Sequence, residues 1–221
     1  ISVSIIPLIR LAFGYPILMG DSVYYDIRVS KSMFDHGLKF DDNLIFGGRT
    51  YIYTPYNIIL ALLLPVFGEG WIILLPILGG IIFAAIFYLL LREMKITWKR
   101  ASFIILVLFL SPPFIFTFST LNPYFISLLL LLFAFFFFLK GDKFFILSLF
   151  FSFFAVISNL LNVLIIIVIL LYFSDLFPLK RRKANITIIF ILVLSFIFYV
   201  PFFFQNTQYI TQEFMEQNTF V

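Results

Sequence analysis

A long apolar block without a single charge constrains this chain more than any other feature. The block covers residues 72–91 and reads IILLPILGGIIFAAIFYLLL. A helix of roughly 20 apolar residues crosses the roughly 30 Å of hydrocarbon in a bilayer. Other apolar blocks follow, and only 12% of the 221 residues are charged, against roughly 25% in a soluble domain. We therefore expect an integral membrane protein that crosses the bilayer several times.

The apolar blocks predict an all-α polytopic transmembrane helical bundle of about seven spans. The predicted spans are 1–19, 71–91, 101–118, 124–139, two short helices within 144–173, and 184–204. As one helix, 144–173 would extend ~45 Å, too long for an ordinary crossing. Polar residues at its middle indicate a turn between two crossings or within a re-entrant pair. We treat 1–221 as a single transmembrane domain and expect it to be the N-terminal part of a longer protein.

The first polar segment, residues 20–70, is predicted to be a long loop with juxtamembrane helices. Its apolar stretch at 55–67 is too short for a full crossing. We interpret that stretch as an interfacial or re-entrant helix. A loop of this length exceeds ordinary connections and tends to be functional.

The distribution of charge predicts which side of the membrane each connection occupies. The linkers 92–100, 140–143 and 174–183 hold four, two and four of the 15 Lys and Arg residues. Cytoplasmic connections carry an excess of Lys and Arg, so we place these three in the cytoplasm of a multi-pass cell-membrane protein. The loop 20–70 and the polar turns near 119–123 and 158–162 then share the extracytoplasmic side.

Composition excludes several kinds of site and partner. The absence of Cys excludes disulfides, thiolate metal sites and cysteine nucleophiles, and the single His36 cannot form a histidine metal cluster. The net charge of +4 is spread between hydrophobic blocks, so it indicates membrane topology and no nucleic-acid partner. No metal-ligand spacing is present, so the sequence assigns no cofactor. Whether the protein uses a divalent metal stays an open question.

Asp21 is the strongest candidate for chemistry in the first loop. It follows the first predicted span directly, so its carboxylate is expected at the bilayer surface. A carboxylate beside a region of low dielectric constant is well placed to act as a general base. The alternative is a solvated acid that flanks a helix, and the residues alone leave both readings open.

Three further polar residues are candidates for the site, and each is also consistent with a structural role. Asp26 lies five positions after Asp21, a spacing that does not put both on one helix face. The guanidinium of Arg49 suits a phosphate, although a plain interfacial arginine is equally consistent. Asn122 precedes the fourth predicted span and can cap that helix.

The order of these features resembles the GT-C superfamily of membrane glycosyltransferases, which includes protein mannosyltransferases and the aminoarabinose transferase that acts on lipid A. The resemblance covers nearly the whole chain through loose motifs. These are Asp21, Tyr24 and Tyr25 with His36 and Gly37; Tyr53 to Tyr56 (YTPY) with Phe67 and Gly68; Asn122 and Pro123; Ser158 to Asn162; and Pro201 with the polar segment after it.

The resemblance implies an inverting transfer of a sugar from a polyprenyl-phosphate donor, which needs no nucleotide. The acceptor would be a lipid, glycan or protein at the extracytoplasmic face, and Asp21 would deprotonate it. Membrane lipids surround such an enzyme. The candidate substrate-binding residues are Tyr25, Asp26, Arg49, Tyr53 and Asn122.

Two positions depart from the family pattern. Asn122 stands where family members carry an acidic residue before proline, and Thr54 stands where some members carry lysine. A multi-pass transporter or lipid flippase is the main alternative, because such proteins also have broken helices with polar residues. A non-enzymatic membrane assembly subunit is the second alternative.

Overall fold

The computed structural model describes residues 9–10, 12–13, 21–37, 41–42, 49–50, 54–71, 74–176 and 181–218. The longer described elements are all helices, in the order α2 (Asp21–His36), α3 (Pro55–Trp71), α4 (Leu74–Glu93), α5 (Trp98–Leu110), α6 (Pro112–Ser119), α7 (Pro123–Lys140), η2 (Asp142–Phe144), α8 (Phe145–Ser158), α9 (Leu161–Leu176) and α10 (Arg181–Asn218). Two short strands, β1 (Asp41–Asp42) and β2 (Arg49–Thr50), pair antiparallel between α2 and α3.

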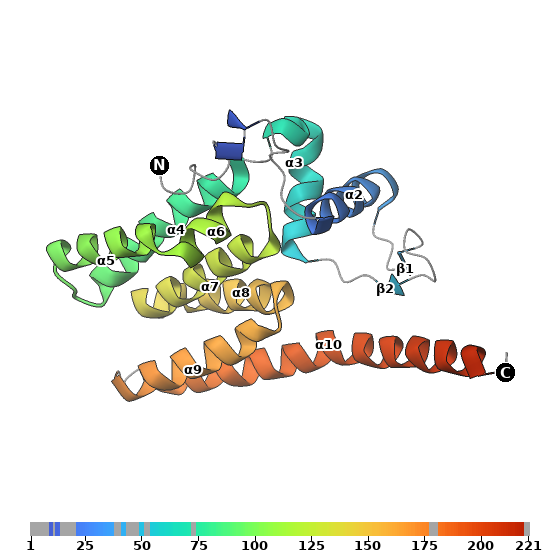
Figure 1. The fold of residues 1–221 in the computed structure, drawn as a ribbon. Coiled ribbons are helices and arrows are strands. Elements are labelled where there is room, and N and C mark those ends of the chain that lie inside the picture. The colour runs from blue at the N-terminus through green and yellow to red at the C-terminus, as the bar shows by residue number, and fades with distance from the viewer. Residues whose placement is uncertain are drawn as a thin grey trace.

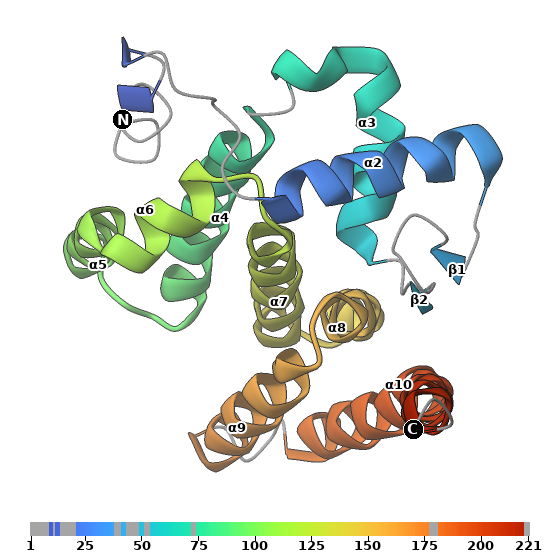
Figure 2. The same cartoon turned by 45° about the vertical axis from the view of Figure 1, so that its right-hand side comes forward.

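Helix α7 lies at the centre of the bundle. It packs against α4 on one side and α8 on the other, while α9 and α10 run side by side beyond α8 (Figure 1). Helices α5 and α6 attach to α4, and α2 lies across α3 at another edge of the molecule (Figure 2). The polar segment 20–70 therefore contributes two helices that pack against each other, and their place at the membrane stays a prediction.

Three described helices are long and apolar enough to cross a bilayer. They are α4, α7 and the Arg181–Val200 part of α10, and the bent pair α5 and α6 would make a fourth. Large apolar side chains cover their outer faces; examples are Leu78, Ile82, Leu106, Ile189 and Phe196. Such exposed apolar surface suits contact with lipid. The first predicted span lies almost entirely outside the described residues, so the larger total stays a prediction.

The predicted span 101–118 is not one straight helix. Helix α5 ends at Leu110, Ser111 is extended, and α6 starts at Pro112 with a 68° change of direction. A proline disfavours helical backbone at the residue before it and lacks the N–H that would continue the helix. Pro112 and Pro113 therefore explain the bend, which the sequence interpretation did not include.

The predicted turn within 144–173 is confirmed. Helix α8 ends at Ser158, and α9 begins at Leu161. The carbonyl of Ala155 accepts from the amide of Asn162 at 2.6 Å and from the backbone N–H of Asn159 at 3.2 Å. These two donors satisfy a backbone carbonyl that would otherwise have no partner at the end of α8.

Small residues of α4 allow close packing against α7 and α6. A Cβ at Gly79 would lie 2.9 Å from the ring of Phe125, and one at Gly80 would lie 3.0 Å from the Cβ of Phe118. Small residues let transmembrane helices approach closely. The same two phenylalanines belong to a buried cluster that includes side chains of α2 and α3, so the two loop helices are packed against the starts of α4 and α7.

Helix α10 extends beyond the last predicted span of 184–204. It runs through Pro201 to Asn218 as one helix of 38 residues. Near its start, Lys183 forms an ion pair with Asp142 in η2. This pair ties the basic start of α10 to the turn after α7, at the end of the bundle opposite Asn122.

Candidate functional site

Asp21, the predicted general base, is the first residue of helix α2. Acidic residues are favoured at this end of a helix because the exposed backbone N–H groups carry partial positive charge. The side chain of Asp21 lies outside the described part of the structure, so its catalytic role stays a prediction. Positions 21 and 26 are roughly 140° apart around the helix, as expected for residues that do not share a face.

Asp26 lies on the side of α2 that faces α3. It follows the buried Val23 and precedes the buried Ile27. One of its carboxylate oxygens accepts from the side-chain amide of Asn57 on α3 at 3.5 Å, near the upper limit for a hydrogen bond. Asp26 therefore connects the acid-bearing helix to the start of α3.

Asn57 also fixes the start of α3. Its amide oxygen accepts from the backbone N–H of Thr54 at 3.2 Å and from the Thr54 hydroxyl at 2.6 Å. This is the reciprocal half of a capping box, in which the third helical residue satisfies the N–H of the cap residue. Asn57 is fully buried, and it lies between Asp26 on α2 and Thr54 at the start of α3.

Thr54 lies at the edge of a pocket of about 320 Å³. Four segments that are distant in sequence form this pocket: the start of α3, the start of α7, the break between α8 and α9, and α10. The described lining residues are Thr54, Pro123, Tyr124, Ile157, Ser158, Asn159, Leu160 and Tyr199. The polar turns that the sequence predicts on one side of the membrane thus meet at one cavity.

Hydrogen bonds with the backbone on either side of the α8–α9 break fix two polar side chains of this pocket. The Tyr199 hydroxyl donates to the carbonyls of Val156 at 2.7 Å and Ile157 at 3.1 Å. The amide oxygen of Asn159 accepts from the backbone N–H of Leu161 at 3.0 Å and so caps α9. Both side chains line the pocket in defined orientations.

Asn122 has a structural role in the described geometry. Its amide oxygen accepts from the backbone N–H of Tyr124 at 2.9 Å and caps α7. Its amide nitrogen donates to the carbonyls of Thr117 at 3.1 Å and Thr120 at 3.0 Å. Both ends of the amide are therefore bonded to protein, although Asn122 lies next to a pocket residue. Its role in substrate binding stays a prediction.

The remaining predicted substrate contacts are only partly described. Tyr25 is half-buried on α2, and the Arg28 guanidinium lies 5.5 Å from the centre of its ring. Arg49 belongs to β2, where it pairs with Asp42 in the ladder, and its side chain is not part of the described structure. Tyr53 lies outside the described residues. No contact with substrate is tested for these three.

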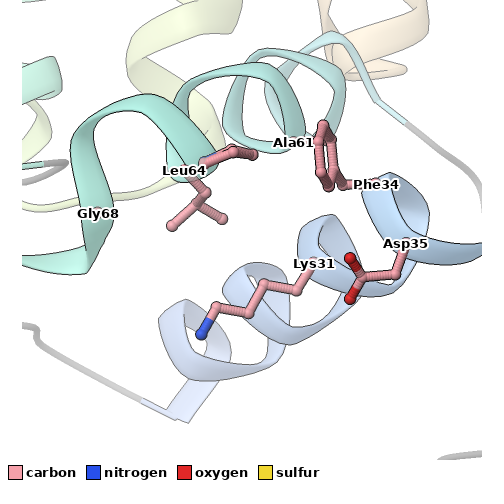
Figure 3. Close-up of a pocket in the computed structure, with 7 residues that line it drawn as sticks. Lys31, Phe34, Asp35, Ala61, Leu64 and Gly68 are labelled. Atoms are coloured by element: carbon pink, nitrogen blue, oxygen red, sulfur yellow. The ribbon is translucent and has the colours of Figure 1, made fainter.

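A second pocket, of about 480 Å³, lies between α2 and α3. Figure 3 shows Lys31, Phe34 and Asp35 on α2 opposite Ala61, Leu64 and Gly68 on α3. The lining combines a charged edge on α2 with an apolar floor on α3. The floor adjoins Val66 and Phe67, whose apolar side chains are exposed. This pocket is therefore amphipathic.

Several features of the site escaped the sequence interpretation. Within the described residues, no group of three or more His, Cys, Asp or Glu could hold a metal ion, and a metal stays an open question. Asn57 and Tyr199 were not singled out from the sequence. A Thr-x-x-Asn spacing before an apolar helix is a visible signal for Asn57, whereas Tyr199 is one tyrosine in an apolar span and gives no signal by itself.

Comparison with known proteins adds no relative: no family model, no curated protein and no solved structure matches this chain.

Proposed function

We propose that this chain is part of an inverting membrane glycosyltransferase that takes its sugar from a polyprenyl-phosphate carrier. Asp21 acts as the general base and takes the proton from an acceptor hydroxyl. The acceptor oxygen forms a bond to the anomeric carbon, and the bond from that carbon to the phosphate oxygen breaks. Polyprenyl phosphate leaves with the bonding electrons, and the configuration at the anomeric carbon inverts.

One observation carries this proposal. The starts of α3 and α7, the α8–α9 break and Tyr199 converge on one pocket. The acid-bearing helix α2 is joined to the edge of that pocket through Asp26, Asn57 and Thr54. A small-molecule site typically has a concave pocket with a few converging polar groups, and the polar groups that converge on this pocket support the proposal.

The proposal includes a sidedness and a larger number of spans. The pocket lies at the end of the bundle away from the basic linkers 92–100 and 140–143. Because Lys and Arg mark cytoplasmic connections, the pocket opens toward the extracytoplasmic face. A polyprenyl-phosphate donor presents its sugar on that face, and further spans complete the bundle of about seven crossings.

The pocket between α2 and α3 suits the lipid part of such a donor. Its floor of Ala61, Leu64 and Pro65 is apolar, and Lys31 on α2 brings a cation to its edge. A polyprenyl phosphate has an apolar chain and an anionic head. The apolar floor therefore suits the chain of this molecule, while the charged edge carries both Lys31 and Asp35.

A transporter is less well supported by the broken helix. In transporters, the unwound backbone carbonyls at a helix break coordinate the transported ion. Here the carbonyls of Ala155, Val156 and Ile157 accept hydrogen bonds from Asn162, Asn159 and Tyr199. The described break is therefore closed by protein groups.

Sugar transfer in membranes tests the proposal directly. Two variants of the full-length protein are expressed. One is Asp21→Asn, and the matched control is Glu93→Gln, which changes an exposed acid at the last residue of α4. General-base catalysis contributes about 10²–10⁴-fold, so Asp21→Asn should slow transfer from polyprenyl-phosphate glucose or mannose by at least about 100-fold. Equal transfer by both variants at equal expression would contradict the proposal. Sugar-lipid flipping without transfer would favour the flippase alternative.

A further inference from the structure

The pocket formed by Thr54, Tyr124, Ser158, Asn159 and Tyr199 offers both donors and acceptors of hydrogen bonds. The hydroxyl of Ser158 donates to the Phe154 carbonyl at 2.8 Å, and the hydroxyl of Thr54 donates to Asn57. Each hydroxyl has a single proton, so toward any further partner both oxygens can act only as acceptors. A ligand that donates hydrogen bonds would match these two lining residues.

Two other groups of the pocket act as donors. The amide oxygen of Asn159 is used by the N–H of Leu161, and its NH₂ group makes no hydrogen bond with any described residue. Tyr124 is 59% exposed, and its hydroxyl likewise has no partner within the described part of the chain. These groups can donate to ligand oxygens, so the pocket requires acceptors as well.

The combination of hydrogen-bond donors and acceptors in the pocket indicates which chemical class of ligand fits it. A phosphate or carboxylate only accepts, and it would meet the lone pairs of Ser158 and Thr54 unfavourably. A hydroxyl group both donates and accepts, so a group with several hydroxyls satisfies all four positions. Tyr199, whose hydroxyl is fixed by its bonds to the end of α8, adds an aromatic residue to the lining.

The size of the pocket agrees with this class. Small-molecule sites typically measure roughly 300–1,000 Å³, and this pocket, at about 320 Å³, is at the lower end. It has room for one ring and not for the whole lipid-linked donor. The longer pocket between α2 and α3 is separate, with a lining of its own that includes Lys31 and Asp35.

We propose that this pocket binds the sugar ring of the donor and selects a neutral, polyhydroxylated sugar over a charged one. The inference rests on the proposed function, because it assigns the sugar subsite of the same reaction. The donor's phosphate lies outside this pocket. Asn159 and Tyr124 are the specificity-determining donors, and Ser158 and Thr54 are the acceptors.

The absence of Cys in this chain permits a direct binding test by alkylation. Leu160→Cys places a reporter at the pocket wall, where residue 160 is 52% exposed. Thr97→Cys is the matched control, because Thr97 is exposed in the basic linker. The full-length variants in glycoside-free nanodiscs are alkylated with N-ethylmaleimide. The additions are polyprenyl-phosphate glucose, polyprenyl-phosphate mannose, polyprenyl-phosphate galacturonic acid, or polyprenyl phosphate alone.

We expect a neutral-sugar donor to slow alkylation at residue 160 by at least about threefold and to leave residue 97 unchanged. The galacturonic acid donor and the sugar-free carrier should leave both rates unchanged. Protection that is equal with and without the sugar, protection by the charged sugar alone, or no protection by any addition would overturn the assignment. Protection does not require turnover, so a protein that is protected but inactive separates a failed function from a failed sugar subsite.

Two variants distinguish recognition from folding. Asn159→Asp keeps an oxygen that can cap α9 and removes the NH₂ donor, while Tyr124→Phe removes only a hydroxyl. Both should bind the neutral-sugar donor more weakly, so that about tenfold more donor is needed for the same protection. Unchanged protection in both variants would exclude these residues as the specificity determinants.

Discussion

Two asparagines at the same end of the bundle cap neighbouring helices but use their amides differently. Asn122 caps α7, and its nitrogen donates to the carbonyls of Thr117 and Thr120. Asn159 lines the pocket and caps α9 through its oxygen, while its nitrogen makes no hydrogen bond within the described part of the chain. The first amide is fully used by the fold, whereas the second has a donor left for a ligand. A cap residue can therefore serve binding only where the surrounding backbone leaves part of it unused.

The largest effect should follow from removing the amide that the fold uses completely. Asn122→Ala should lower the free energy of unfolding by about 2 kcal/mol, because the variant loses a helix cap worth about 1 kcal/mol and leaves two carbonyls without their donor. Thermal unfolding in nanodiscs measures the change. A loss well below 1 kcal/mol would show that the fold does not depend on the Asn122 amide, and the contrast with Asn159 would fail.

The second effect concerns activity. Asn159→Asp should reduce transfer of a neutral sugar about tenfold, equivalent to about 1.4 kcal/mol, since the donor to the sugar is lost. Its stability should stay within about 0.5 kcal/mol of wild type because a carboxylate oxygen can still cap α9. Transfer rates and unfolding temperatures are compared on one preparation. A parallel loss of stability and activity would mean that Asn159 acts through the fold.

A smaller loss of stability is expected for Asn159→Ala. Only the cap of α9 is removed, so the free energy of unfolding should fall by about 1 kcal/mol. This is about half of the loss expected for Asn122→Ala, and the same unfolding measurement compares them. Equal losses in the two alanine variants would remove the difference between the two turns.

The smallest effect is expected at Tyr199, where Tyr199→Phe keeps the ring and removes the hydroxyl bonded to Val156 and Ile157. Hydrogen bonds between transmembrane helices average about 0.6 kcal/mol, so the free energy of unfolding should fall by about that amount. Hydrogen exchange at the end of α8 should increase locally. A loss above 2 kcal/mol would show that the break depends on Tyr199 more than the average hydrogen bond between helices explains.

Much of the fold can be predicted from the sequence because the bilayer imposes a simple length requirement. The spans at α4 and α7 and the turn at Ser158 follow from apolar length and from polar residues at the middle of a long block. The bend at Ser111 could also have been predicted, since Pro112 and Pro113 interrupt the block. The packing of α2 across α3 could not, because a span-length criterion does not describe helices that lie beside the bundle.

The candidate site was only partly predictable. Asp21, Asn122 and Asn159 are polar residues next to apolar blocks, and this position makes them visible in the sequence. Asn57 and Tyr199 join the site through contacts across 31 and 43 positions of the chain. No local pattern specifies such contacts, since they depend on which helices become neighbours.

The sequence by itself determined that this protein is helical and has segments long and apolar enough to span a membrane, because hydrophobic length and charge act locally along the chain. It also located the turns where polar groups gather. Only the tertiary structure decided that Thr54, Tyr124, Asn159 and Tyr199 share one pocket, and which of two capping amides retains a donor. Both depend on the partners that packing brings to each polar atom, and a hydrogen bond used by the fold is no longer available to a ligand.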